Sequence, residues 1–280
     1  MQNTALKRIG AASKYLVIVA AVLVFIGWFV STPAGLLGKA DSIAYAVCHR
    51  ISERSFHIGN IQLPLCARCS GMYLGAVVGL VFQSVIGWKR GRIPPWSVLA
   101  VLVVFFAAFA VDGANSYLYL LKQLRPGILP WLPNIYIPNN TLRLFTGSGM
   151  GLDMVILLFP AFNQSIWSDC DEKKRALPGW KMFGLLVGIQ VVLDLLVLTQ
   201  SPLVLYPLAI IGVLGVLLLL TMIYTLVYVM ILGQDNKFTK MRQLWLPLLA
   251  GFTIAMIQTT AIDMLRFWLT GTWGAIPLPT

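Results

Sequence analysis

The sequence has little charge. Asp, Glu, Lys and Arg together make up only 11% of its 280 residues, whereas about a quarter of the residues in a soluble domain are charged. This is too little charge to solvate a globule of such length, and 58% of the residues are apolar. A water-soluble fold is therefore disfavoured, and the lipid bilayer must surround most of the side chains.

The sequence also lacks the short strands of alternating polarity that a membrane barrel requires. Within hydrocarbon the backbone must satisfy its own hydrogen bonds, so only a helix bundle or a closed barrel is available. Long unbroken apolar runs are present instead, such as residues 99–110 and 214–220. The sequence therefore predicts an all-α polytopic bundle that forms a single membrane domain over residues 1–280.

Seven apolar segments are long enough to cross about 30 Å of hydrocarbon. They lie near residues 14–34, 70–88, 95–113, 142–163, 181–200, 203–232 and 244–269. The first segment resembles a signal peptide, but we interpret it as a retained transmembrane helix. We expect a multi-pass protein of the cell membrane, with the bilayer as its first partner.

The basic residues predict the orientation of the bundle. Of the 21 Lys and Arg residues, 13 fall on the side of the N-terminus and 8 on the opposite side. Because basic residues accumulate on the cytoplasmic side, we expect the N-terminus inside and the C-terminus outside. The net charge of +11 does not indicate nucleic-acid binding, since no basic stripe is interleaved with aromatic residues.

Two predicted outer segments are long. Residues 35–69 hold three of the four cysteines and both histidines, and residues 114–141 are rich in proline and aromatic residues. We expect the second segment to lie on the membrane surface or to cap the bundle. Glycines recur every fourth residue in two predicted helices, which lets helix backbones approach closely. They are Gly71, Gly75 and Gly79, and Gly147 and Gly151.

The cysteines of the first outer segment have the spacing of a metal site. Cys66 and Cys69 form a Cys-x-x-Cys turn, and Cys48 and His49 lie upstream of it. A pair, a loop and a Cys-x-x-Cys turn match tetrahedral zinc with three cysteines and one histidine as ligands. Thiolates favour zinc or copper over harder cations. The helix predicted to begin after Cys69 would also favour thiolate over thiol.

Other interpretations of these cysteines stay open. Cys66 and Cys69 could exchange electrons with Cys48 as the resolving thiol, or a disulfide could form. Three cysteines on the outer side argue against a purely structural set of disulfides. All three could also pack without chemistry, and adjacent Cys48 and His49 must turn back to reach one metal ion.

Polar residues are expected at the same face as the cysteines. Asp112 ends the third predicted helix there, and Asn140 and Arg143 begin the fourth. Glu53 and Asp112 are the candidate catalytic bases beside a metal-activated water. Arginines and Asn140 would bind an anionic ligand such as a lipid phosphate. These arginines are Arg50, Arg54, Arg68 and Arg143.

Acidic residues within predicted helices are costly in a membrane and so are candidates for function. They are Asp112, Asp153, Asp194 and Asp263. Structural ion pairs offer the alternative explanation, with Asp112 paired to Arg143 and Asp263 paired to Arg266.

Several of these motifs resemble the signature of an uncharacterised family of bacterial and archaeal multi-pass membrane proteins. The resemblance lies in Cys48-His49-Arg50, in Gln62-Leu-Pro-Leu-Cys66-Ala-Arg68-Cys69, and in the following Gly71-Met-Tyr73-Leu-Gly75. Asp112-Gly113 and Asn140-Thr-Leu-Arg143-Leu-Phe-Thr146-Gly147 resemble its later motifs. The resemblance covers about residues 40–155 and implies a shared fold and site, without an activity.

The leading functional hypothesis is a metal-dependent hydrolase or transferase that acts on a lipid or an anionic head group. The alternatives are a thiol-redox protein, a transporter with a path of aspartates, and a subunit of a homo-oligomer or larger membrane assembly. The sequence contains no P-loop, Rossmann fingerprint or His-Glu-x-x-His motif. Nucleotide-driven and standard metalloprotease functions are therefore disfavoured.

Overall fold

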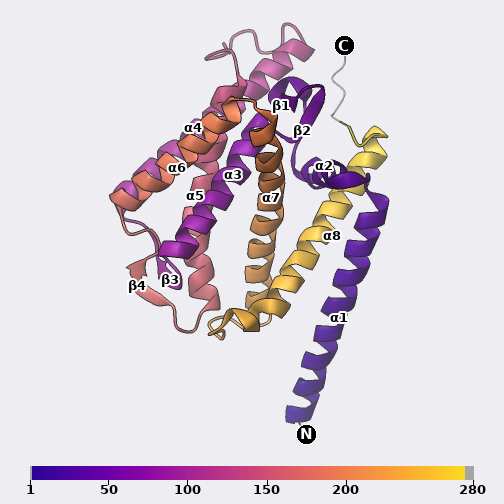
Figure 1. Ribbon diagram of the computed structural model, residues 1–280, viewed down its shortest axis with the longest axis vertical. Coiled ribbons are helices and arrows are strands. Elements are labelled where there is room, and N and C mark those ends of the chain that lie inside the picture. Colours follow the sequence, from indigo (N-terminus) through magenta and orange to yellow (C-terminus); the bar gives the residue numbers. More distant parts are fainter. Residues whose placement is uncertain (1, 275–280) are drawn as a thin grey trace.

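Seven helices are long and apolar enough to cross a membrane, in a computed structural model that describes residues 2–274 and the side chains of residues 14–274. They are α1 (Gln2–Ser31), α3 (Ala67–Ile86), α4 (Trp96–Leu124), α5 (Asn140–Ile166), α6 (Trp180–Leu198), α7 (Pro202–Ile231) and α8 (Trp245–Thr270). The predicted all-α membrane bundle is confirmed. Figure 1 shows the N-terminus at one end of the bundle and the C-terminal part at the other; which end is cytoplasmic stays a prediction.

Short elements lie at the two ends of the bundle. One end carries α2 (Gly35–Val47), the 3-10 helix η1 (Ser52–Arg54) and an antiparallel hairpin of β1 (Ser55–Ile58) and β2 (Ile61–Cys66). The opposite end carries the parallel pair β3 (Arg90–Arg92) and β4 (Asp171–Arg175), and η2 (Met241–Leu244) (Figure 1). The first outer segment, residues 35–69, is thus a folded structure.

Helix α4 continues well past its predicted end at residue 113 and stops at Leu124. The predicted surface segment 114–141 is therefore divided: its first part is helical, and residues 125–139 have no regular structure apart from turns. The polar residues that suggested the helix end lie on its buried side, where Asn115 and Ser116 are 4% and 1% exposed. The sequence shows that these residues are polar but not that they are buried, and for this reason the helix was predicted to end too early.

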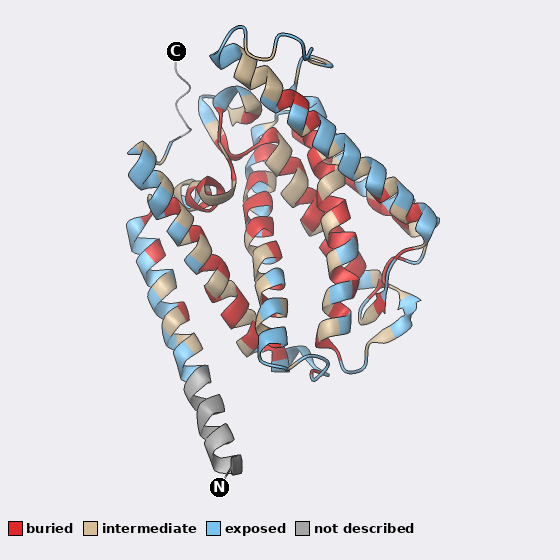
Figure 2. Cartoon of the chain, turned by 180° about the vertical axis from the view of Figure 1, so that it is seen from behind, coloured by how far each residue is buried: buried red, intermediate tan, exposed pale blue. Residues whose placement is uncertain are grey.

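The centre of the bundle is the contact between α3 and α5, and Figure 2 shows the buried residues concentrated there, while residues 14–31 of α1 are largely exposed. A Cβ atom on Gly71 would lie 2.1 Å from the carbonyl oxygen of Leu144, and one on Gly151 would lie 2.0 Å from that of Met72. The glycine repeats thus let the two backbones touch, as expected for small residues at this spacing.

The C-terminal end of α2 is held by α8. Arg266 donates hydrogen bonds to the carbonyl oxygens of Tyr45, Cys48 and His49. Its guanidinium also lies 3.9 Å from the centroid of the Tyr45 ring. The predicted pair of Arg266 with Asp263 is wrong: among the described residues no ion pair joins them.

Candidate functional site

Three cysteines converge at the end of the bundle that carries the hairpin. The sulfur atoms of Cys48, Cys66 and Cys69 all lie within 4.8 Å of one another. Cys48 directly follows α2, Cys66 ends β2 and caps α3, and Cys69 lies in the first turn of α3. The hairpin folds the chain back so that the Cys66 amide donates a hydrogen bond to the Cys48 sulfur at 3.3 Å.

The three sulfurs lie in apolar surroundings. Cys48 is 5% and Cys66 2% exposed, and they pack in one cluster with Trp28, Val213 and Met256. Hydrogen bonds from the neighbouring thiols lower the pKa of Cys48. The pKa of Cys66 is raised to about 12, chiefly because its thiol donates to the Cys48 sulfur. The three thiols thus form one hydrogen-bonded group in which the Cys48 sulfur is the acceptor.

His49 stands apart from the sulfur cluster. Its Nδ1 accepts a hydrogen bond of 2.9 Å from the backbone N–H of Ile51, so in a neutral ring Nε2 carries the proton. A ring nitrogen binds metal only when it is unprotonated. The pKa of His49 is lowered, first by burial and then by nearby arginines. Its role as a fourth ligand stays a prediction that requires the ring to release Ile51.

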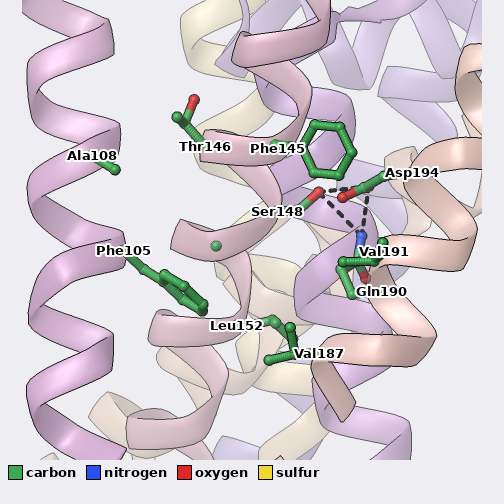
Figure 3. A pocket seen from close by; sticks show the side chains of 11 residues that line it. Phe105, Ala108, Phe145, Thr146, Ser148, Leu152, Val187, Gln190, Val191 and Asp194 are labelled. Carbon is green, nitrogen blue, oxygen red and sulfur yellow. Dashed lines mark hydrogen bonds between the residues drawn. The ribbon is translucent and has the colours of Figure 1, made fainter. Parts of the chain in front are cut away.

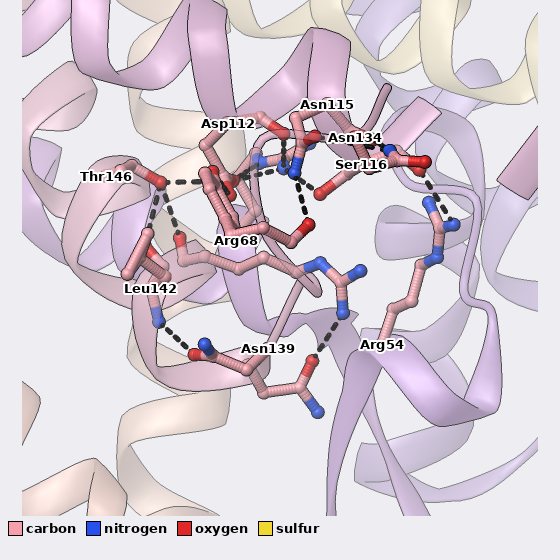
Figure 4. A network of polar contacts seen from close by, with 12 residues as sticks. Arg54, Arg68, Asp112, Asn115, Ser116, Asn134, Asn139, Leu142 and Thr146 are labelled. Carbon is pink, nitrogen blue, oxygen red and sulfur yellow. Dashed lines mark hydrogen bonds and ion pairs between the residues drawn. The ribbon is translucent and has the colours of Figure 1, made fainter. Parts of the chain in front are cut away.

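A second group of residues lies on the other side of the same turn of α3. We define the basic cluster as Arg54, Arg68 and Arg143. Arg68 forms an ion pair with Asp112, and its Nε lies 3.1 Å from Asp112 Oδ2 (Figure 4). Asp112 is 1% exposed and also accepts a hydrogen bond of 2.7 Å from the Tyr136 hydroxyl. The predicted pairing of Asp112 with Arg143 is therefore wrong, because Arg68 occupies the carboxylate.

The basic cluster carries more positive charge than its neighbours neutralise. Arg54 donates to the Ser116 carbonyl at 3.1 Å, and Arg143 donates to Asn140 Oδ1 at 2.9 Å, so neither pairs with a carboxylate (Figure 4). Arg143 is only 6% exposed, and its Nε has no hydrogen-bond partner among the described residues. Burial lowers the pKa of Arg54, and the nearby charge of Arg68 lowers it further.

The remaining predicted site residues have separate positions. Arg50 pairs with Asp41 at 2.8 Å and donates to the Trp273 carbonyl at 3.1 Å, which places it among structural contacts. The Asn140 amide donates to the Glu53 carbonyl at 3.2 Å and so joins the start of α5 to η1. The Glu53 side chain is exposed. The catalytic roles of Glu53 and Asp112 stay predictions.

Sequence reasoning missed the residues that hold the irregular segment 125–139 over this end of the bundle. Asn115 donates to the Tyr136 carbonyl at 2.9 Å and accepts from the Ile135 amide at 2.9 Å. The Tyr136 hydroxyl of the same segment donates to Asp112 Oδ1 at 2.7 Å. A signal was available, because Asn115 and Ser116 follow Asp112 by three and four residues and share its face in a longer helix.

Comparisons with known proteins agree with the assignment as a membrane protein. Residues 48–157 match a family model described as predicted membrane protein (DUF2085). An uncharacterized protein of Methanocaldococcus jannaschii is 27% identical over 167 residues, which cover 55% of this chain and 95% of that protein. An uncharacterized protein of Methanothermobacter thermautotrophicus is 28% identical over 111 residues, which cover 40% and 83%. No solved structure matches. The chain is thus a multi-pass membrane protein whose residues 48–157, including the cysteine and basic clusters, match an uncharacterised family of predicted membrane proteins.

Proposed function

We propose that the protein is a membrane-embedded metalloprotein in which Cys48, Cys66 and Cys69 bind one zinc ion, beside a basic cluster that binds an anionic head group. The mutual approach of the three sulfurs, all within 4.8 Å, carries the proposal. Zn–S bonds of about 2.3 Å in tetrahedral geometry separate sulfurs by about 3.8 Å, so a small shift is sufficient. A disulfide would use two of these sulfurs and leave the third without a role.

The chemistry of the three ligands fits zinc. Thiolates are preferred ligands of zinc and copper(I), and they disfavour magnesium and calcium. The positive end of the α3 dipole lies at Cys66 and Cys69 and would favour the thiolates that a bound metal requires. When bound, the metal would neutralise these thiolates and join the end of α2 to the start of α3. His49 or a water molecule would take the fourth position.

The basic cluster suits a phosphate-bearing head group. Like charges that are partly buried together are costly unless an anion accompanies them. Arginine presents a planar fork of donors that matches phosphate oxygens. Asp112 already accepts from Arg68 and Tyr136, so it is poorly placed to act as a free base. Binding of a head group is therefore better supported than hydrolysis or transfer.

Metal analysis of the full chain, purified in detergent without added zinc, tests the first part. We expect one zinc ion per chain by inductively coupled plasma mass spectrometry. Thiol labelling should find the three cysteines protected until a chelator is added. A chain without stoichiometric metal, in which reductant releases two labelled thiols, would overturn the zinc proposal and support the thiol-redox alternative.

Replacement of Arg143 by glutamine tests the head-group site. Losing one charge-assisted hydrogen bond should weaken binding of phosphatidic acid about tenfold. Native mass spectrometry of the detergent-purified chain measures this, with phosphatidylcholine and inorganic phosphate as comparison ligands. Arg125→Gln is the matched control, because Arg125 is exposed and follows α4 at the same end. Equal binding by the Arg143 and Arg125 variants would contradict the assignment.

A further inference from the structure

A cavity of about 290 Å³ lies between α4, α5 and α6, within the membrane-spanning part of the bundle. Its walls are mostly apolar. They are formed by Phe105, Ala108, Phe145, Leu152, Val187 and Val191. Three buried polar side chains also face it, namely Ser148, Gln190 and Asp194 (Figure 3). No member of the cysteine cluster or of the basic cluster lines the cavity, although Thr146 on its wall contacts Asp112, the partner of Arg68.

The hydrogen bonds of the three polar residues leave only acceptors unused. Ser148 donates to Asp194 Oδ1 at 2.7 Å. The Gln190 amide donates to Asp194 Oδ1 at 2.9 Å and to Ser148 Oγ at 3.1 Å (Figure 3). Asp194 is 1% exposed, and neither its Oδ2 nor Gln190 Oε1 has a partner among the described residues.

Asp194 Oδ2 and Gln190 Oε1 determine which kind of ligand the cavity can bind. A carboxylate within a membrane is costly unless it is paired, and both unused atoms accept hydrogen bonds, so a ligand that donates hydrogen bonds and carries positive charge satisfies both of them. An alkali or alkaline-earth ion would need several more oxygen ligands, and the remaining walls are apolar except for Thr146, whose hydroxyl already donates to Asp112 and to backbone carbonyls. An organic ammonium meets both conditions, because its alkyl part can occupy the apolar walls and Phe105 and Phe145 offer aromatic faces.

We propose that this cavity binds an amphiphile that carries a primary ammonium group, with the ammonium donating to Asp194 Oδ2 and Gln190 Oε1 and the alkyl chain lying between α4 and α6. The site does not depend on the zinc or head-group proposals. Its ligand class is distinct, because the basic cluster attracts anions and this cavity attracts cations.

Titration calorimetry with octylammonium chloride tests the proposal. The full chain is placed in phosphatidylcholine nanodiscs, and empty nanodiscs provide the background. We expect saturable binding of one octylammonium per chain. Octyltrimethylammonium has the same charge without N–H donors and should bind about tenfold more weakly, while octanoate should not bind.

Two variants locate the site. Asp194→Asn removes the charge at nearly constant shape and should weaken octylammonium binding about tenfold or more. Ala108→Leu should block the cavity while Asp194 stays intact. Asp153→Asn is the control. Asp153 is buried within a membrane-spanning helix, as Asp194 is, but it lies in α5 and lines a different groove. Folding of each variant is checked by size-exclusion chromatography.

Some results would overturn the proposal. No saturable binding to the folded wild-type chain would mean that a proton alone occupies Asp194. Equal binding of octylammonium by the wild-type, Asp194→Asn and Ala108→Leu chains would place the ligand elsewhere. Retained zinc in the Asp194→Asn chain would show that any loss of binding is independent of the metal centre.

Discussion

Cys66→Ser protein will melt about 10 °C below the wild-type chain and will contain no zinc. In the structure Cys66 caps α3, and its sulfur lies within 4.8 Å of the sulfurs of Cys48 and Cys69. A ligand at about a thousandfold excess over its dissociation constant stabilises the folded state by about 4 kcal/mol, which corresponds to about 10 °C in a chain of this size. Tryptophan fluorescence during heating in detergent measures the change.

Cys170→Ser is the matched control for this experiment. Cys170 is a free, partly exposed thiol that follows α5 at the opposite end of the bundle. Its replacement should change neither the zinc content nor the melting temperature. A chelator should lower the melting temperature of the wild-type chain toward that of Cys66→Ser, and should have no further effect on that variant. Identical melting of wild-type and Cys66→Ser chains would contradict a stabilising metal.

Gly147→Ala will disrupt the contact between α3 and α5. A Cβ atom at this position would lie 2.1 Å from the carbonyl oxygen of Arg68. Since this oxygen belongs to the backbone, only a displacement of the whole helix can relieve the clash. Overpacking of this kind costs about 3 kcal/mol or more. We expect a small fraction of monodisperse protein by size-exclusion chromatography, and reduced zinc content because the displaced turn of α3 carries Cys69.

Gly184→Ala is the control for the glycine prediction. No heavy atom within 4 Å would meet a Cβ at Gly184, which lies in α6. Alanine is also the better helix former by about 1 kcal/mol in water. The Gly184 variant should therefore equal or slightly exceed the wild-type chain in yield and melting temperature. If both variants behaved like wild type, close backbone contact would not be what holds α3 against α5.

Much of the fold could be predicted because the bilayer imposes a simple rule on sequence. A helix must present about 20 apolar residues to cross it, and all seven predicted segments contain such helices. The first and last residues of the helices were harder to predict. Helix α3 begins at Ala67, because β2 leads directly into it and Cys66 is its cap. Ser70 lies inside the first turn and donates to the Leu65 carbonyl at 3.4 Å.

The candidate site was only partly predictable. The cysteine spacing predicted that Cys48, Cys66 and Cys69 lie close together, and the structure confirms it. The Cys-x-x-Cys turn and the upstream cysteine allow few other arrangements. The partner of Asp112 could not be read from the sequence. Arg68 and Arg143 were both available at the same end of the bundle, and the choice depends on which face of α3 is directed toward α4. That rotation is set by contacts with α5 and α7.

The sequence by itself determined that this protein is a membrane bundle in which Cys48, Cys66 and Cys69 and the basic cluster gather at one end. Low charge and long apolar runs were sufficient to predict the membrane helices, because each helix depends mainly on the residues within its own segment. Only the tertiary structure decided that His49 stands apart from the sulfurs, that Arg68 pairs with Asp112, and that Asp194 lines a cavity in which its Oδ2 has no hydrogen-bond partner among the described residues. Such facts depend on helix rotation and on side-chain directions across helices, which no local pattern in the sequence specifies.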